Sequence, residues 1–350
     1  MDFALDEQQT LLRDSVARFV AQGGIGAAHW QQFADMGWLG AGLPESAGGY
    51  GGSALDVAII AEQLGRGLVI EPFVEVAVLA AQALLPMQHE PPAAAALAAL
   101  IEGRSIVAPA LQPQGAELSE TRSGLRLSGA QTLVVGGTRA DRFVVAATEG
   151  GGLSLLLLDA ATPGLRRHDY RLIDGSAACD LHFDEMAIDG HQRLGAPGGA
   201  GPVIAAAREQ AIVAQCAQAL GVMDLALSTT RDYLLQRRQF GQPIASFQVL
   251  RHRLADMLLA QEQARAALHG ALAALSVEEG DVRRRAVAIA KVQSGRSGRF
   301  VGAQAIQLHG GIGMTDEYLI GHCFKRLMVL DQAQGSAAAH LATLAGRSTP

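Results

Sequence analysis

The chain has 350 residues, of which 49% are hydrophobic and 18% charged, and its formal net charge is −6. This length predicts two or three domains, and the abundance of alanine and glycine favours a mainly helical protein with close helix–helix contacts. The 28 basic and 34 acidic residues are spread along the sequence, so no basic run indicates nucleic-acid binding.

The first 103 residues have the periodicity of helices joined by glycine-rich turns. In "LDEQQTLLRDSVARFV", Leu12, Val16 and Phe19 recur at helical spacing behind Asp6, a typical N-terminal cap. This acidic, amphipathic start is unlike a signal or transit peptide, and the apolar runs further on are too short or too interrupted to span a bilayer. We therefore expect an N-terminal helical domain over residues 1–103, no membrane span and a cytoplasmic location.

Between residues 104 and 190 the pattern changes to short alternating or β-branched runs, such as "LRLSG", "TLVVGG" and "DRFVVAAT". Glycine-rich turns separate these runs, and "TEGGGLS" is typical of a hairpin connection. We predict a compact antiparallel β domain over residues 104–190. The three cysteines, Cys179, Cys216 and Cys323, are far apart and odd in number, so neither a disulfide framework nor a metal site is expected.

From residue 191 the helical period returns. In "FQVLRHRLADMLLAQEQARAAL", Phe247, Leu250 and Leu254 fall on one face. Three such long helices and a shorter terminal one predict a four-helix bundle over residues 191–350. The fold class is therefore mainly α with a central β domain.

Two segments of the predicted bundle are candidates for ligand binding. "RRQFGQPIASFQ", residues 237–248, is either a turn between helices or a loop whose arginine fork binds a diphosphate. "QLHGGIGMTDEY", residues 307–318, is either a glycine-capped helix end or a place where the backbone approaches a ligand closely. It follows a helical stretch rather than a strand, so it is not a Rossmann glycine motif.

In this order and within this three-part layout, the segments resemble the acyl-CoA dehydrogenase family of flavoproteins. The resemblance covers nearly the whole chain, and its most specific parts are "LSTTRDYLLQRRQFGQPIASFQVLRHRLADM" and "AIQLHGGIGMTDEY". Within the family, the chain is most similar to the group typified by the small subunit of pimeloyl-CoA dehydrogenase and by steroid-side-chain acyl-CoA dehydrogenases.

The resemblance implies an oligomer that binds FAD near the protomer interface. It assigns the diphosphate and adenosine end of FAD to Arg237 and Phe240. The other cofactor-binding positions that it implies are Gln248, Gln307, Gly310, Gly311 and Ser336. In the family, residues of these motifs reach mainly the FAD bound by the neighbouring protomer.

The resemblance also implies a reaction, the α,β-dehydrogenation of an acyl-CoA thioester, with an electron-transfer flavoprotein reoxidising the FAD. A carboxylate removes the α-proton, and in most members it is the Glu of a Glu-Gly-Thr stretch near the C-terminus. The matching stretch here is Gln334-Gly335-Ser336. At the position of the usual base, Gln334 is therefore an amide that does not act as a base.

Some members carry the base on the first bundle helix, at a position that corresponds to Ala211. Glu209 lies two residues away, about 200° around an α-helix, so it faces elsewhere unless the helix is shifted. Glu209 is either a replacement base or a solvated surface charge beside Arg208.

The β domain also departs from the family. The Trp-Ile-Thr strand that covers the flavin ring corresponds to Leu133-Val134-Val135, which lacks the aromatic ring and the hydroxyl. Two functions remain open. The chain is an FAD-dependent acyl-CoA dehydrogenase subunit, or it is a non-catalytic partner that completes the site of a homologous, base-bearing chain in a heteromer.

Overall fold

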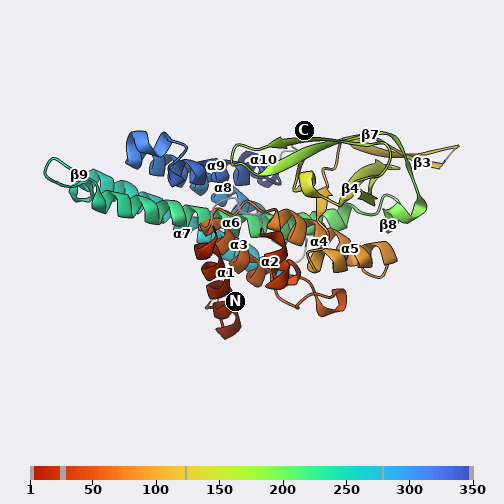
Figure 1. Ribbon diagram of the computed structural model, residues 1–350, viewed down its shortest axis with the longest axis horizontal. Coiled ribbons are helices and arrows are strands. Elements are labelled where there is room, and N and C mark those ends of the chain that lie inside the picture. Colours follow the sequence, from red (N-terminus) through yellow and green to blue (C-terminus); the bar gives the residue numbers. More distant parts are fainter. Residues whose placement is uncertain (1–3, 24–28, 123, 278–279, 347–350) are drawn as a thin grey trace. The chain divides into compact units, whose positions relative to one another are not determined.

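The protein is described by a computed structural model that covers residues 4–23, 29–122, 124–277 and 280–346 (Figure 1). The chain divides into two compact units. One, the bundle unit, is built from segments 1–27, 54–70 and 212–350, and the other, the sheet unit, from segments 28–53 and 71–211. The order of helices, sheet and helices along the chain confirms the predicted fold class. The domain boundaries at residues 103 and 190 stay a prediction, because each compact unit combines several segments.

The bundle unit is mainly helical in its described part, with one short two-stranded hairpin after α6. Its helices are α1(Glu7–Gln22), α3(Ala54–Arg66), the C-terminal part of α6(Gly201–Gln236), α7(Gln248–Val277), α8(Asp281–His309), α9(Leu319–Gln332) and α10(Ala337–Leu344). The predicted cap of the first helix is confirmed. The carboxylate of Asp6 accepts a hydrogen bond from the Gln9 backbone N–H at 2.8 Å, and the Gln9 side chain accepts one from the Asp6 N–H at 3.2 Å.

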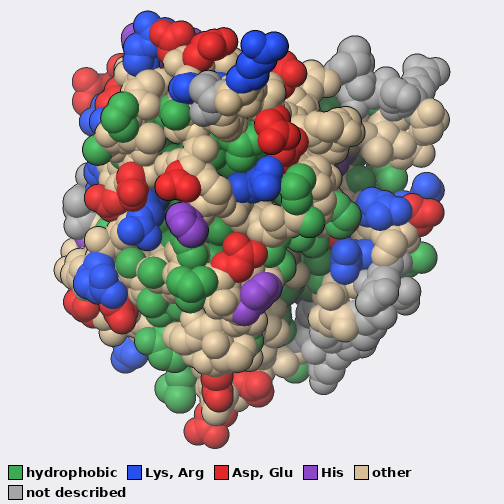
Figure 2. All heavy atoms as spheres, turned by 90° about the vertical axis from the view of Figure 1, so that its right-hand side faces the viewer, with side chains coloured by type: hydrophobic (Ala, Val, Ile, Leu, Met, Phe, Trp, Pro, Cys, Tyr) green, Lys and Arg blue, Asp and Glu red, His purple; other side chains and the backbone are tan. Residues whose placement is uncertain are grey.

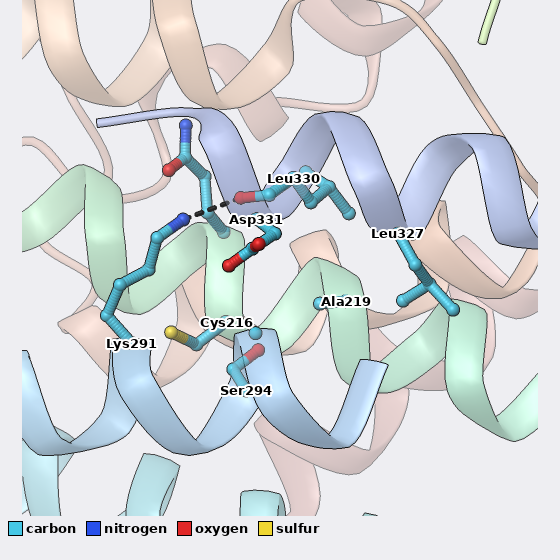
Figure 3. Close-up of a pocket in the computed structure, with 9 residues that line it drawn as sticks. Cys216, Ala219, Lys291, Ser294, Leu327, Leu330 and Asp331 are labelled. Carbon is cyan, nitrogen blue, oxygen red and sulfur yellow. Dashed lines mark hydrogen bonds between the residues drawn. The ribbon is translucent and has the colours of Figure 1, made fainter. Parts of the chain in front are cut away.

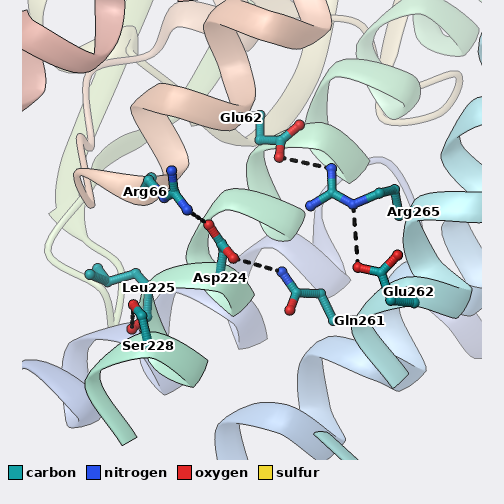
Figure 4. A network of polar contacts seen from close by, with 8 residues as sticks. All are labelled: Glu62, Arg66, Asp224, Leu225, Ser228, Gln261, Glu262 and Arg265. Carbon is teal, nitrogen blue, oxygen red and sulfur yellow. Dashed lines mark hydrogen bonds and ion pairs between the residues drawn. The ribbon is translucent and has the colours of Figure 1, made fainter. Parts of the chain in front are cut away.

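Helices α3 and α6 cross closely because each has a glycine at the crossing. A Cβ on Gly65 would overlap the Gln218 carbonyl oxygen, and a Cβ on Gly221 would overlap that of Glu62. Polar pairs flank the crossing (Figure 4). Asp224 of α6 pairs with Arg66 of α3 and accepts a hydrogen bond from the Gln261 side chain of α7 at 3.1 Å.

The sheet unit contains short helices, a π-helical segment, Val74–Ala80, and one mixed sheet. Its described α-helices are α2(Trp30–Asp35), α4(Ala81–Leu84), α5(Pro91–Ile101) and the N-terminal part of α6. The strands of the sheet are β1(Val107–Ala110), β2(Ala116–Thr121), β3(Gly124–Val135), β4(Arg142–Glu149), β5(Gly152–Asp159), β6(Leu165–Arg171), β7(Ala177–Ile188) and β8(Arg193–Leu194). They follow the order β6-β7-β3-β2-β4-β5-β8, with β1 beside β4.

The prediction of a purely antiparallel sheet is wrong at β1 and β2. Strand β1 pairs with β4 in parallel, with Val107 opposite Arg142, and β2 has a parallel pair with β4 at Glu117 and Thr148. Along the chain, β1 follows a helical segment, and β2 and β3 lie between β1 and β4 in the sequence. No hairpin therefore forces an antiparallel pairing.

Helix α6 also corrects the expectation drawn from the apolar runs. By length and composition alone it is long and apolar enough to cross a membrane, because its uninterrupted helix is longer than the sequence pattern indicated. However, 78% of its most apolar window is buried inside the protein, as in a core helix. On the face shown in Figure 2, basic and acidic side chains are interspersed, and neither sign forms a continuous patch.

Candidate functional site

The first candidate segment forms a short hairpin at the end of α6. Strands β9(Arg238–Gln239) and β10(Gln242–Pro243) pair antiparallel, and Phe240 and Gly241 form the connection. Phe240 has a φ of 52°, and its side chain is 88% exposed. Its ring meets that of Phe247 edge-on, with the centroids 6.0 Å apart.

Next to the hairpin, Arg237 and Gln248 are exposed at the end of α6 and the start of α7. Among the described residues, nothing pairs with the Arg237 guanidinium. The segment is thus both a turn between helices, as the simpler interpretation held, and a surface that presents a cation beside an aromatic ring.

The second candidate segment begins where α8 ends. Gly310 caps the helix, since its N–H reaches the carbonyl oxygens of Ile306 and Gln307, and its φ of 65° suits glycine. Gly310 and Gly311 are exposed, and an added Cβ on either would meet no atom within 4 Å. A ligand therefore has open space to approach this backbone closely.

Both segments lie at the same end of the bundle unit. The ring of His309 packs at a tilt against that of Tyr233, with centroids 4.4 Å apart, and lies 5.1 Å from the ring of Tyr318. At the neighbouring end of α7, Arg253 donates a hydrogen bond to Gln304 of α8 at 3.3 Å. The structure thus places the segment of Arg237, Phe240 and Gln248 and the segment of Gln307, Gly310 and Gly311 at one end of the bundle unit.

The turn between α9 and α10 carries the third set of predicted residues. Gln334 has a φ of 55° and Gly335 one of 95°, and Ser336 caps α10 by accepting a hydrogen bond from the Ala339 N–H at 3.3 Å. The side-chain oxygen of Gln334 is buried and accepts no hydrogen bond from the described residues. An amide oxygen in this setting accepts a hydrogen bond from a ligand but does not take up a proton.

Backbone strain marks several of these positions. Among the described non-glycine residues, φ is positive at five: Leu68, Leu133, Glu185, Phe240 and Gln334. Three of them, Leu133, Phe240 and Gln334, are positions that the sequence resemblance ties to the cofactor or the base. Non-glycine residues in this conformation cost energy and concentrate at functional sites, which supports a functional role for all three.

In the sheet unit, Leu133 lies on a bulge of β3 rather than in regular strand geometry. The register with β7 shifts between Gln131 and Val134, and the Leu133 side chain is 43% exposed. Asp180 holds the bulge by accepting hydrogen bonds from the Leu133 N–H at 3.0 Å and from the Tyr170 hydroxyl at 2.7 Å. Burial, with the Asp180 hydrogen bond and charge, raises the pKa of Tyr170 to about 12. The hydroxyl therefore stays protonated and keeps donating.

The interpretation of Glu209 as a solvated surface charge is wrong. Its exposed fraction is 8%, and the pKa of its neighbour Arg208 is lowered by burial. Periodicity did not show this because α6 is buried around most of its circumference, so its charged residues are not confined to a solvent face. Glu209 belongs to the sheet unit and Gln334 to the bundle unit.

Sequence reasoning missed a cavity beside the glycine turn. It has a volume of about 160 Å³ and is lined mainly by apolar atoms, with Met314, Phe324 and Ile306 among its residues. At its rim, Lys325 donates to the Asp316 carboxylate at 2.8 Å and lowers the pKa of that carboxyl group. In the sequence, this ion pair was visible only as Asp316 at the end of "GGIGMTD" and Lys325 nine positions later. Because this spacing fits no helical repeat, the sequence did not indicate that the two side chains meet.

The fold and these segments define a flavin-dependent dehydrogenase of acyl thioesters, and comparison with known proteins agrees. Residues 6–103 match the acyl-CoA dehydrogenase N-terminal domain, and residues 203–349 match the acyl-CoA dehydrogenase C-terminal domain. The chain is 31% identical over 346 residues to the acyl-CoA dehydrogenase IpdE2 of Mycobacterium tuberculosis. The matched region covers 95% of this chain and 92% of that relative. The chain belongs to the acyl-CoA dehydrogenase family, whose members are FAD-dependent oxidoreductases acting on the CH–CH bond of acyl-CoA.

Two solved structures match over almost the whole chain. The ChsE4–ChsE5 complex of Mycobacterium tuberculosis is 26% identical, with full coverage of both chains and a TM-score of 0.87. The Tcur3481–Tcur3483 steroid ACAD is 28% identical, with 97% of each chain covered and a TM-score of 0.85.

The residues at the end of the bundle suit FAD. The exposed Arg237 guanidinium matches the charge of a diphosphate, and the open backbone at Gly310 and Gly311 admits close approach. The sheet unit is less favourable for the flavin ring, because Leu133 offers a small, partly exposed aliphatic side chain instead of an aromatic cover.

Proposed function

We propose that this chain is a subunit of a heteromeric, FAD-dependent acyl-CoA dehydrogenase and that a homologous partner chain supplies the catalytic carboxylate. The observation that most directly supports this proposal is Gln334, an amide on the strained turn where the family's base is expected. In this proposal the complex oxidises an acyl-CoA thioester in the cytoplasm and passes electrons to an electron-transfer flavoprotein.

The amide at residue 334 limits what this chain does by itself. A dehydrogenation of this kind needs a base for the α-proton, and a positioned base contributes about 10²- to 10⁴-fold in rate. When bound, FAD supplies the acceptor for the β-hydrogen as hydride. Gln334 keeps an acceptor oxygen that orients a donor group, but it leaves the α-proton in place.

The residues at the end of the bundle support a contribution to a partner's cofactor. In this proposal, Arg237 binds the diphosphate, Phe240 flanks the adenosine end, and Gln248, Gln307, Gly310 and Gly311 complete the contacts. A Phe side chain that is 88% exposed in one chain has much apolar surface to bury against a second chain or its ligand. The two matched structures named above both carry two-component names, which supports a pair of unlike chains here.

Co-expression with a homologous chain that carries an intact Glu-Gly-Thr stretch tests the proposal. We expect a stable mixed complex with about one FAD per unlike pair and little FAD in either chain alone. Arg237→Ala should weaken FAD binding by about 10- to 150-fold, because hydrogen bonds to charged groups contribute about 1.5 to 3 kcal/mol. Arg231→Ala is the matched control, since Arg231 is an exposed arginine of the same helix that pairs with Asp232.

Two results would refute the heteromer. One is a set of separate homo-oligomers on mixing. The other is brisk turnover of an acyl-CoA by the isolated chain, abolished by Glu209→Gln, which would make the chain a self-sufficient homo-oligomeric enzyme with its base on α6.

A further inference from the structure

One face of α8 is built to hold the turn that carries Gln334. Lys291, Gly295 and Arg299 are spaced four residues apart and therefore lie in a row along the helix. All three meet the α9–α10 segment, at Leu330, Asp331 and Ala337. None of these contacts lies at the end of the bundle unit that carries Arg237 and Gly310.

Lys291 is the deepest of the three. Its exposed fraction is 2%, and its ammonium donates a hydrogen bond to the Leu330 carbonyl oxygen at 2.5 Å (Figure 3). Burial lowers the pKa of Lys291, while the nearby Cys216 and Asp331 act in the opposite direction. The chain contains two lysines, Lys291 and Lys325, and otherwise uses arginine. A buried lysine here is therefore a specific feature of this position.

The space around Lys291 is too small for a substrate. The cavity that Figure 3 shows, with Cys216, Ser294 and Asp331 among its lining residues, has a volume of about 10 Å³. Such a cavity holds at most one water molecule. The cluster is thus an internal support rather than a ligand site.

Asp331 connects the row on α8 to the turn. Its buried carboxylate accepts a hydrogen bond from Arg299 at 2.9 Å and another from the Ala337 N–H, the first residue of α10, at 3.1 Å. Gly295 makes this approach possible, because a Cβ there would overlap the Asp331 carboxylate. One carboxylate therefore fixes both ends of the five-residue connection between Asp331 and Ala337.

The turn itself is held in a costly conformation. Gln334 and Gly335 both have positive φ, and the Gln334 carbonyl oxygen lies 3.0 Å from His340 Nε2. A non-glycine residue keeps a left-handed backbone only where its surroundings enforce it. The contacts from α8 supply that enforcement on the α9 side of the turn, and His340 on the α10 side.

We propose that Lys291 and Arg299 are positioning residues that act through Leu330 and Asp331 to present residue 334 to the shared site. This inference rests on the proposed function for its consequence in catalysis. Its structural part, that these two side chains hold the turn, stands independently of it.

Hydrogen exchange in the full chain tests the structural part. Arg299→Gln is the principal variant, because the Arg299 side chain is 59% exposed and its replacement leaves the core packed. We expect the amides of residues 333–337 to exchange about ten-fold faster or more, while the rest of α8 keeps its protection. Arg299→Lys, which keeps a cation beside Asp331, should restore much of the protection.

Two matched controls accompany this measurement. Arg296→Gln removes an exposed arginine one turn away on the same helix. Lys325→Met is the control for a second variant, Lys291→Met, which should also speed exchange at the turn because it removes the hydrogen bond to Leu330. Both controls should leave exchange at the turn unchanged. Equal exchange in Arg299→Gln and Arg296→Gln would overturn the proposal, whether or not Lys291→Met folds.

Kinetics in the mixed complex test the catalytic part. With Gln334→Glu in this chain and the partner chain's base Glu changed to Gln as the background, Arg299→Gln should lower kcat about ten-fold while KM stays within about two-fold, because a displaced base affects the chemical step rather than binding. An unchanged kcat together with faster exchange would refute positioning. If Gln334→Glu itself gives no rate, the proposed site at residue 334 fails, and the exchange result still decides whether α8 holds the turn.

Discussion

The imidazole of His309 packs against the ring of Tyr233 with their centroids 4.4 Å apart and their planes inclined by 30°. This contact joins the last turn of α8 to the last turns of α6. Since the RRQFG hairpin follows α6 and Gly310 follows α8, one ring pair sets the spacing of the two candidate FAD-contact segments. His309 Nδ1 is committed to the Ala305 carbonyl oxygen at 2.8 Å, which fixes the ring's orientation.

We expect this end of the bundle to loosen at acid pH. Burial lowers the pKa of His309 below its ordinary value of 6.5, so the folded state favours the neutral ring. The resulting stability is present above pH 6.5 and is lost as the pH falls through the lowered folded-state pKa. Between pH 7 and pH 5, His309→Phe should therefore lose less thermal stability than the wild type. The exposed His252→Gln should behave as wild type, and identical pH profiles for all three proteins would contradict the assignment.

Two glycine-to-alanine changes, one at the close crossing of α3 and α6 and one on the exposed side of α7, should change the free energy of unfolding in opposite directions. A Cβ on Gly221 would overlap the Glu62 carbonyl oxygen, so Gly221→Ala should destabilise the protein by about 1 to 3 kcal/mol or more through overpacking. Gly270, on the exposed side of α7, has nothing within 4 Å of an added Cβ. Gly270→Ala should therefore stabilise by about 0.5 to 1 kcal/mol through helix propensity. Chemical denaturation of the two variants measures both signs, and two changes of the same sign would contradict the crossing geometry.

Much of the fold followed from the sequence because local rules governed it. The cap at Asp6 and the helical period of α7 depend on neighbours within four residues, and both appear as expected. The parallel pairing of β1 with β4 did not follow, because it depends on where a strand enters a sheet and leaves no mark on its own residues.

The candidate site shows the same difference between features that local sequence predicts and features that depend on tertiary packing. The RRQFG and HGG segments were visible as motifs, and the structure places them at one end of the bundle unit. The burial of Glu209 and the support of the turn by Lys291 were not visible. Both depend on which helices surround a residue, and a single charged side chain in a helical pattern is more often solvated. The four-residue spacing of Lys291, Gly295 and Arg299 was the available signal.

The buried thiols predict a change in reactivity with pH. Burial raises the pKa of Cys216 to about 11 and that of Cys323 to about 12, from the ordinary thiol value of 9.0. Both thiols should resist alkylation at pH 8 in the folded protein and react readily in denaturant, because the thiolate is the reactive form. Rapid native alkylation of Cys216, mapped by mass spectrometry, would contradict its burial.

The same thiols should make the fold sensitive to alkali. Because their folded-state pKa values lie above the unfolded value of 9.0, the stability they contribute is present below pH 9 and is lost as the pH rises through about 11 to 12. Each thiol lowers the free energy of unfolding by up to about 1.4 kcal/mol per pH unit in that window. Cys216→Ala should make the decline between pH 9 and pH 11 shallower by up to this slope, as measured by denaturation at each pH.

The last prediction concerns Gln334 itself. Gln334→Glu places a carboxylate on a turn whose backbone is already held with a φ of 55°, so the change needs no new conformation. If the flavin pocket is competent, the variant should gain about 10²- to 10⁴-fold in the rate of flavin reduction by an acyl-CoA, or about 3 to 5.5 kcal/mol of barrier. Gln334→Met, which is neutral and similar in size, should gain nothing. Anaerobic stopped-flow reduction with saturated acyl-CoAs of several sizes measures the rate. If Gln334→Glu and Gln334→Met are equally slow while FAD is fully bound, the missing aromatic cover at Leu133, rather than the missing carboxylate, limits this chain.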